Sequence, residues 1–347
     1  MPAAVPGPTE GAIGPTGLYL RETADWRNVE SKRQTISIIT PFYNEEENIV
    51  TCATECARVM REALPEFDYE HIFADNASTD NGLQLLREIA VRDPQVKIIV
   101  NSRNVGTFRS ILNALASASG DAVVPMLPAD LQDPPQVIPQ LVESWLRGNL
   151  VVYGIRTNRR EGSLLRASRG LFYRLMNLSG GEQRAPAHAG EFQLLDRCVV
   201  GSIVALDDQH PYIRGLVAQT GARWDTVEYE WQQRRAGKSK HNFWSLVDQA
   251  VNAYVTTARA PSRIALLLGL VASAFGIVYG LVALVALAVT RGEVSAGVPT
   301  LIVGVFLFGG LNLFFLGLIG EYVLSIHAQV RRGPAMFEIE RINFEEE

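Results

Sequence analysis

The sequence is poor in cysteine, which argues against a disulfide-stabilised fold and against a metal site built on cysteines. Its three cysteines, Cys52, Cys56 and Cys198, are too few and too irregularly spaced for a disulfide framework. Cys52 and Cys56 lie four residues apart on a predicted helix, but no histidine or cysteine pair completes a metal site with them. We therefore expect ordinary reduced thiols, as in the cytosol.

Positive charge is also scarce. The 32 Lys and Arg residues are outnumbered by 37 Asp and Glu residues, which gives a formal net charge of -5. Nucleic-acid binding calls for a basic face, so we do not expect a nucleic-acid partner. The first residues are rich in Pro, Gly and Ala and contain no long apolar run, so we expect no signal peptide there.

Charge is absent from two long stretches near the C-terminus, residues 264–289 and 300–320. As a helix, the first would be roughly 39 Å long, enough to cross a hydrocarbon core of ~30 Å. We predict a membrane hairpin; a buried helix pair in a soluble core is the alternative. Arginines are more frequent outside the two stretches than in the loop between them: Arg259, Arg263, Arg331 and Arg332 against Arg291. The positive-inside rule then predicts a multi-pass protein of the inner membrane with a cytoplasmic catalytic domain.

The remainder of the chain alternates between strand-like and helical patterns. Strands are predicted at residues 35–40, 69–74, 96–100 and 122–127, and helices at residues 45–64, 81–92 and 109–118. This alternation indicates βαβ units and a parallel sheet. The predicted organisation is a flexible tail (1–33), an α/β domain (34–240), an amphipathic helix (241–262), a membrane hairpin (263–321) and a cytoplasmic tail (322–347). The amphipathic helix lies either on the membrane surface or against the domain.

Polar residues follow successive strands, where binding sites form in open α/β sheets. Glu45 follows the first predicted strand and Asp75 the second, although acidic turn residues also serve as helix caps. Asp130 and Gln132 follow the fourth strand and offer two oxygen ligands for Mg²⁺ or Mn²⁺ on a diphosphate. Asp133 precedes Pro134 and is predicted to cap a helix.

Five short segments of the chain together resemble the motifs of a known family. They are Pro-Phe-Tyr-Asn-Glu (41–45), Ala-Asp-Asn-Ala-Ser-Thr-Asp (74–80), Ser-Arg-Asn-Val-Gly (102–106), Pro-Ala-Asp-Leu-Gln-Asp-Pro-Pro (128–135) and Gly-Glu-Phe-Gln (190–193). Their order resembles the family 2 glycosyltransferases over roughly residues 34–335. The likeness is greatest to the branch of dolichol-phosphate-mannose synthases and polyprenyl-phosphate glucosyltransferases, which carries a C-terminal membrane hairpin. It implies a GT-A domain, which is a nucleotide-sugar-binding α/β fold with a Rossmann-like mixed sheet.

The resemblance also implies a role for individual residues. On the donor side, the residues expected to bind the nucleotide sugar are Pro41, Tyr43, Glu45, Asp75, Asp130, Arg235 and Lys240. Asp130 and Gln132 are expected to hold the metal. Arg235 and Lys240 belong to a basic loop (234–240), which could instead bind anionic lipid head groups. On the acceptor side, Arg156 is expected to contact a phosphate, with Arg166 and Arg169 as helpers. Residues 211–215 resemble a segment beside the active site.

Two departures from the family pattern concern the chemistry. Pro128 stands where the family often has Asp, so Asp130, Gln132 and phosphate oxygens would hold most of the metal. Glu191 stands where Asp is commoner and is longer by one methylene, which bears on any acceptor-side role of this carboxylate.

The implied activity is an inverting transfer of a sugar from a nucleotide diphosphate to a polyprenyl phosphate at a lipid bilayer. A phosphate monoester carries about -1.5 to -2 charge at neutral pH and attacks without a strong base. Asp130 and Arg156 would then be the catalytic residues, acting by positioning and charge stabilisation. Analogy favours UDP-glucose as the donor and is compatible with a homo-oligomer.

Two alternatives stay open on the sequence. Pro128 is compatible with a catalytically degenerate membrane scaffold of the same fold. Residues 219–224 are one residue too long for the Gln-x-x-Arg-Trp signature of processive polysaccharide synthases.

Overall fold

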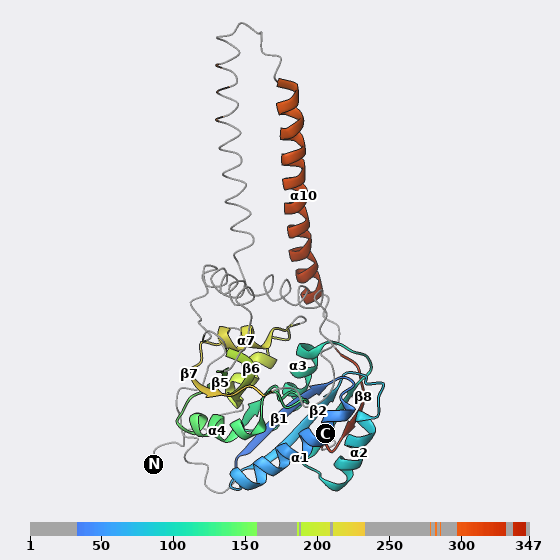
Figure 1. Cartoon of the computed structure of the whole chain (residues 1–347), viewed down its shortest axis with the longest axis vertical. Helices are drawn as coiled ribbons and strands as arrows, with labels where there is room; N and C mark the ends of the chain where they lie inside the picture. Colours follow the sequence, from blue (N-terminus) through green and yellow to red (C-terminus); the bar gives the residue numbers. More distant parts are fainter. Residues whose placement is uncertain are drawn as a thin grey trace, which may run out of the picture.

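The computed structural model describes residues 33–157, 186, 189–208, 211–232, 278, 282, 285, 297–330 and 336–344. The described strands are β1 (Thr35–Phe42), β2 (Asp68–Asp75), β3 (Val96–Asn101), β4 (Ala122–Val124), β5 (Val151–Arg156), β6 (Ala189–Asp196), β7 (Trp224–Tyr229) and β8 (Glu338–Ile342). They form one sheet in the order β7-β5-β6-β4-β1-β2-β3-β8 (Figure 1). The sheet is mixed, because β6 and β8 run antiparallel to their neighbours. This agrees with the predicted GT-A type of α/β fold.

Helices cover both faces of the sheet. The described helices are α1 (Glu46–Ala63), α2 (Gly82–Arg92), α3 (Thr107–Ser117), the 3₁₀ turn η2 (Pro135–Val137), α4 (Ile138–Leu146), α6 (Arg197–Val204), α7 (Ile213–Gln219) and α10 (Gly297–Val330). One hydrophobic core lies under α1, α2 and α4, and a second lies under α3, α6 and α7. Strands buried on both faces are apolar almost throughout, as in β1, where Ile36, Ile38 and Ile39 are fully buried.

The predicted fourth strand is shorter than expected. β4 ends at Val124 because Pro125 has no amide hydrogen to continue the ladder. The chain stays beside β1 nonetheless, since the Leu127 amide donates to the Ile39 carbonyl at 2.8 Å. Residues 128–133 are therefore held next to the carboxyl end of β1. The predicted strands and helices between residues 35 and 118 are confirmed to within two residues at each end.

The C-terminal part of the chain differs from the sequence-based prediction. Residues 300–320 lie within α10, which continues to Val330 and points away from the α/β layers in Figure 1. No helix among the described residues meets the length and hydropathy that a membrane span requires. The first predicted span, 264–289, lies outside the described residues apart from 278, 282 and 285.

The last strand was not predicted at all. β8 pairs antiparallel with β3 at the edge of the sheet (Figure 1). Glu340 forms an ion pair with Arg87 of α2, and the side-chain Nδ2 of Asn343 donates to the Ala90 and Val96 carbonyls at 2.8 and 2.9 Å. The predicted cytoplasmic tail thus contributes an element of the α/β domain.

Candidate active site

The carboxyl ends of the parallel strands meet at one edge of the sheet. The register aligns Phe42 at the end of β1 with Asp75 at the end of β2, and Asp75 with Val100 of β3. Loops that follow these strands therefore converge at this edge, where sites of open α/β folds form. The sequence predicted this convergence.

Hydrogen bonds join the loops after β1 and β2 into one unit. The Asn44 amide donates to the Ser78 hydroxyl at 2.9 Å, and the Thr79 amide donates to Asn44 Oδ1 at 2.6 Å. Asn44 has a φ of 54°, in the left-handed region that asparagine tolerates better than most residues. Two residues further along both segments, the Glu46 amide donates to Asp80 Oδ2 at 3.0 Å. The two segments expected to bind the nucleoside are thus adjacent and mutually fixed.

The four residues expected to bind the nucleoside differ in exposure. Tyr43 is 38% exposed, whereas Asp75 is almost completely buried. Pro41 lies within β1, beside β2. Burial raises the pKa of Asp75, and hydrogen bonds from Ser78 oppose that shift. Glu45 accepts a hydrogen bond from the Asn48 side chain at 2.8 Å. Of these four side chains, Tyr43 exposes an aromatic ring.

A tight turn after β4 presents Asp130 and Gln132. Leu131 between them is buried with a φ of 56°, and its amide donates to the Pro128 carbonyl at 3.0 Å. The Gln132 amide donates to Asp130 Oδ1 at 3.2 Å. The described residues contain no group of three His, Cys, Asp or Glu that could hold a metal ion. One carboxylate and one amide fit Mg²⁺ or Mn²⁺ that arrives with a diphosphate, because such ions take most of their ligands from phosphate and water.

Asp133 does not cap a helix, so that prediction is wrong. Pro134 occupies the cap position of η2. The buried Asp133 carboxylate instead accepts two hydrogen bonds from Arg156, from Nε at 2.9 Å and from Nη2 at 2.7 Å. It also accepts one from the Tyr229 hydroxyl at 2.5 Å. A bidentate charge pair of this kind is stronger than a capping bond and joins the turn after β4 to the ends of β5 and β7.

Arg156 is therefore held by protein groups along one edge of its guanidinium. Burial alone would lower its pKa, but Asp133 and Tyr229 outweigh burial and raise it, so the cation is permanent. The guanidinium lies over the Trp231 ring, with 5.6 Å between carbon and ring centroid. Nη1 makes no hydrogen bond within the described residues and remains available for an anion. The structure thus supplies a positioned cation, although its main partner, Asp133, was not predicted.

Glu191, at the start of β6, lies close to this arginine. Burial raises the pKa of Glu191 to about 7, and the nearby Arg214 and Arg156 cations oppose part of the shift. Tyr153 of β5 belongs to the same group, since burial raises its pKa to about 12 with smaller effects from Arg214 and Glu191. A carboxyl group that titrates near neutral pH at a strand end is a candidate functional group. Sequence reasoning singled out Glu191 only as a departure and did not assign Arg214 a role.

The strand order separates two sides of this site. β6 lies between β4, which leads into the Asp130 turn, and β5, which ends at Arg156. Glu191 thus lies between the expected donor side and the expected acceptor side. The other residues expected in the site, Arg166, Arg169, Arg235 and Lys240, lie outside the described residues.

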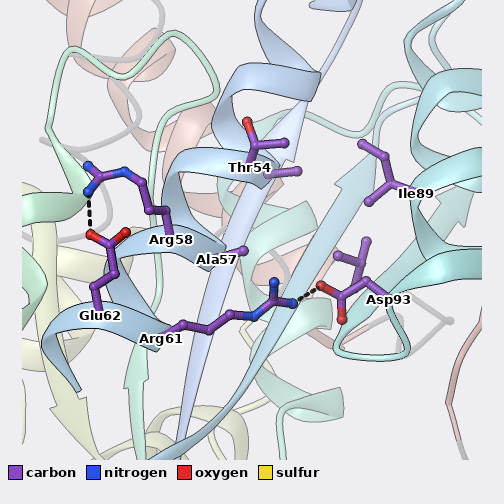
Figure 2. Close-up of a pocket in the computed structure, with 9 residues that line it drawn as sticks. Thr54, Ala57, Arg58, Arg61, Glu62, Ile89 and Asp93 are labelled. Carbon is purple, nitrogen blue, oxygen red and sulfur yellow. Dashed lines mark hydrogen bonds and ion pairs between the residues drawn. The ribbon is translucent and has the colours of Figure 1, made fainter. Parts of the chain in front are cut away.

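A separate hollow of about 380 Å³ lies between α1 and α2 (Figure 2). Its charged side chains neutralise one another: Arg58 pairs with Glu62 at 2.7 Å, and Arg61 pairs with Asp93 at 2.6 Å. Val96, the first residue of β3, also lines it, so it lies toward the amino ends of the strands. We place the active site at the opposite edge, where the candidate residues converge.

Comparisons with known proteins identify the family of the chain. Residues 37–200 match the family described as Glycosyl transferase family 2. The chain is 34% identical over 306 residues to uncharacterized glycosyltransferase YkcC of Bacillus subtilis (strain 168), an alignment that covers 88% of this chain and 93% of that protein. The chain belongs to glycosyltransferase family 2.

Another family 2 relative is the SfII prophage-derived bactoprenol glucosyl transferase of Shigella flexneri. It is 33% identical over 300 residues, which cover 86% of this chain and 96% of that protein. The chain is therefore a glycosyltransferase, as its motifs predicted. Among solved structures, glucosyl-3-phosphoglycerate synthase from Mycobacterium tuberculosis in complex with Mn²⁺, UDP and phosphoglyceric acid aligns with a TM-score of 0.45 and 20% identity, covering 64% of this chain and 77% of that chain.

Proposed function

We propose that this glycosyltransferase moves a sugar from a nucleotide diphosphate to a polyprenyl phosphate. The observation that carries the proposal is the Asp133–Arg156 pair, which fixes a cation beside the turn that holds Asp130 and Gln132. Transfer between two phosphate groups needs two such sites, one for the leaving diphosphate and one for the attacking phosphate. The name of the Shigella flexneri relative, bactoprenol glucosyl transferase, supports a polyprenyl acceptor and glucose as the sugar.

The donor would lie against the loops after β1, β2 and β4. Tyr43 would stack on the base, and Asp75 with its neighbouring loop would shape the nucleoside site. Asp130 and Gln132 would hold Mg²⁺ or Mn²⁺ on the diphosphate, where the ion supplies charge stabilisation to the leaving group. We propose UDP-glucose as the donor.

The acceptor phosphate would lie at Arg156. Nη1 would donate charge-assisted hydrogen bonds to the phosphate and orient it toward the anomeric carbon. Glu191 titrates near neutral pH and would hold the proton of a phosphate that arrives as the monoanion. A phosphate oxygen forms the new bond as the nucleoside diphosphate leaves, so one displacement inverts the anomeric configuration. An α-linked donor would then give a β-linked product.

We also propose that the protein works at a bilayer of the inner membrane, with its catalytic domain in the cytoplasm and α10 against lipid. The large apolar side chains of α10 that are more than 45% exposed are Leu301, Val305, Phe308, Leu313, Leu316, Ile319, Val323, Leu324, Ile326 and Val330. Apolar area of this extent calls for cover by lipid or by another apolar surface. A second copy of the chain would provide such a surface within a homo-oligomer.

The test uses membranes that contain either the wild-type chain or Asp130→Ala. Each receives undecaprenyl phosphate, Mg²⁺ or Mn²⁺ and one of several radiolabelled nucleotide sugars, and label in the lipid extract is counted. We expect label with UDP-glucose that requires the metal and falls at least ~100-fold in the variant. Wild-type membranes that bind nucleotide but label no lipid with any donor would contradict the polyprenyl acceptor.

A further inference from the structure

Gln193 of β6 is a buried amide without a partner. Its side chain is fully buried, and neither Nε2 nor Oε1 has a hydrogen-bond partner in the part of the chain that the structure describes. Buried polar groups are nearly always paired, and an unpaired one destabilises the fold. A residue such as methionine or leucine would fill the same space without this cost. The amide therefore calls for an explanation other than stability.

Gln193 faces the side of the sheet that α3, α6 and α7 cover, the same side as Tyr153. Its neighbours Phe192 and Leu194 pack into the core under α1, α2 and α4, so the Gln193 side chain points to the other face. There it lies opposite Tyr153 of β5 in the strand register. The charges of Arg214 and Glu191 in turn affect the pKa of Tyr153, although less than burial does. Gln193 thus belongs to the cluster that surrounds Glu191.

The strand pairing is irregular at this point. Between two paired positions, the four residue steps from Ala189 to Gln193 on β6 face the two steps from Tyr153 to Ile155 on β5. Gly154 permits this close approach, because a Cβ there would come within 2.8 Å of the Phe192 carbonyl oxygen. Such bulges re-aim side chains and are common beside active sites. Here the extra residues fall at Glu191, beside Gln193.

We propose that the Gln193 amide binds hydroxyl groups of the sugar that is being transferred and helps to select it. The inference rests on the proposed function. The transferred sugar must lie between the leaving diphosphate and the acceptor phosphate. β6 lies between β4, which leads into the turn with Asp130, and β5, which ends at Arg156. The chemistry also favours a sugar over a phosphate. Hydroxyl groups donate and accept, so they can satisfy both ends of the amide, whereas a phosphate dianion only accepts and would leave Oε1 unpaired.

The first experiment measures binding without any lipid acceptor. Gln193→Met keeps the approximate shape of the side chain and removes the amide, and Gln140→Met on the exposed face of α4 is the matched control. With the full chain in detergent and Mg²⁺, we expect unchanged affinity for UDP and about three- to tenfold weaker binding of UDP-glucose in Gln193→Met only. Equal loss for both ligands, or no change for either with a folded variant, would overturn the proposal. The second result would mean that the amide holds at most a buried water.

The second experiment identifies the hydroxyl that is bound. A series of UDP-deoxyglucoses, each lacking one hydroxyl, is compared with UDP-glucose in both proteins. For one member of the series we expect wild type to lose affinity while Gln193→Met loses nothing further, since the interaction is already absent. Losses that are additive at every position would contradict a direct contact. If wild type binds UDP-glucose but labels no polyprenyl phosphate, the proposed acceptor fails while this inference stands.

Discussion

The two edges of the catalytic sheet treat buried polar groups differently. At the amino edge, the buried Glu70 carboxylate accepts from the Ser37 hydroxyl at 2.5 Å, the Lys97 ammonium at 2.6 Å and the Ser119 amide at 2.6 Å. Elsewhere in the sheet, Gln193 within β6 has no partner among the described residues, and the Arg156 guanidinium at the carboxyl end of β5 is only partly engaged. Satisfied polar groups stabilise a fold, whereas groups with spare capacity await a ligand. The Glu70 group is thus built for stability, whereas Arg156 and Gln193 keep capacity for a ligand.

The largest effect should come from breaking the amino edge. Glu70→Ala would leave the half-buried Lys97 and the buried Ser37 hydroxyl without their shared partner, so we expect a loss of about 3 to 4 kcal/mol in the free energy of unfolding. Chemical denaturation monitored by circular dichroism measures it. The fraction that remains folded should bind UDP-glucose normally. A variant that keeps its stability but loses binding would contradict the division between the edges.

A substitution at the carboxyl edge should instead reduce activity more than stability. Asp133→Asn removes the charge that holds Arg156, and we expect transfer to fall about 10- to 100-fold with a stability loss of roughly 2 kcal/mol, because Arg156 is partly solvent-exposed. Tyr229→Phe is the milder control, since it removes one hydrogen bond and leaves the ion pair. Wild-type transfer rates in Asp133→Asn would refute the positioning role.

The pH dependence of stability should differ in sign between the edges. Burial raises the pKa of Glu191 to about 7 from an ordinary value of 4.5, so its protonated form is favoured in the folded state. The stability linked to Glu191 is complete below pH 4.5 and is lost as the pH rises through 7. Wild type should therefore lose about 2 kcal/mol in the free energy of unfolding between pH 5 and 8 because of Glu191, and Glu191→Gln should not show this loss. Melting temperatures across that range measure it, and parallel curves for both proteins would contradict the shift.

Glu70 provides the opposite case. Burial would raise its pKa, but the hydrogen bonds from Lys97 and Ser37 and from the Ser119 amide outweigh burial and lower it. Its contribution is present above pH 4.5 and is lost as the pH falls through the lowered value. Glu70→Gln should therefore cost more stability at pH 7 than at pH 3.

The smallest effect should arise at the sheet border. Arg87→Ala removes the exposed ion pair with Glu340 of β8, and we expect less than ~1 kcal/mol, further reduced by salt. A loss above 2 kcal/mol that persists in 0.5 M NaCl would show that β8 is held mainly by this pair and not by its backbone pairing with β3.

Sequence patterns predicted the regular elements well where local signals decide them. The apolar runs of β1 to β3 and the acidic start of α1 marked their elements, and the loops after β1 and β2 were expected to meet. Sequence patterns could not show that Asp133 binds Arg156 and does not cap a helix. The two residues are 23 positions apart, and their contact depends on how the strands pack. The unpaired amide of Gln193 likewise becomes visible only when its surroundings are known.

β8 was missed for a related reason, because nothing local in Glu-Ile-Glu-Arg-Ile (338–342) shows which distant strand it pairs with. Its place has a consequence for biosynthesis. Arg87 and Glu340 are 253 residues apart, so at 5 to 20 residues per second the ribosome needs roughly 10 to 50 s to deliver the partner of an already emerged β3. During that time β3 is an open edge that can pair with other nascent chains. The catalytic sheet is completed only when Glu338–Ile342 has been synthesised and has paired with β3.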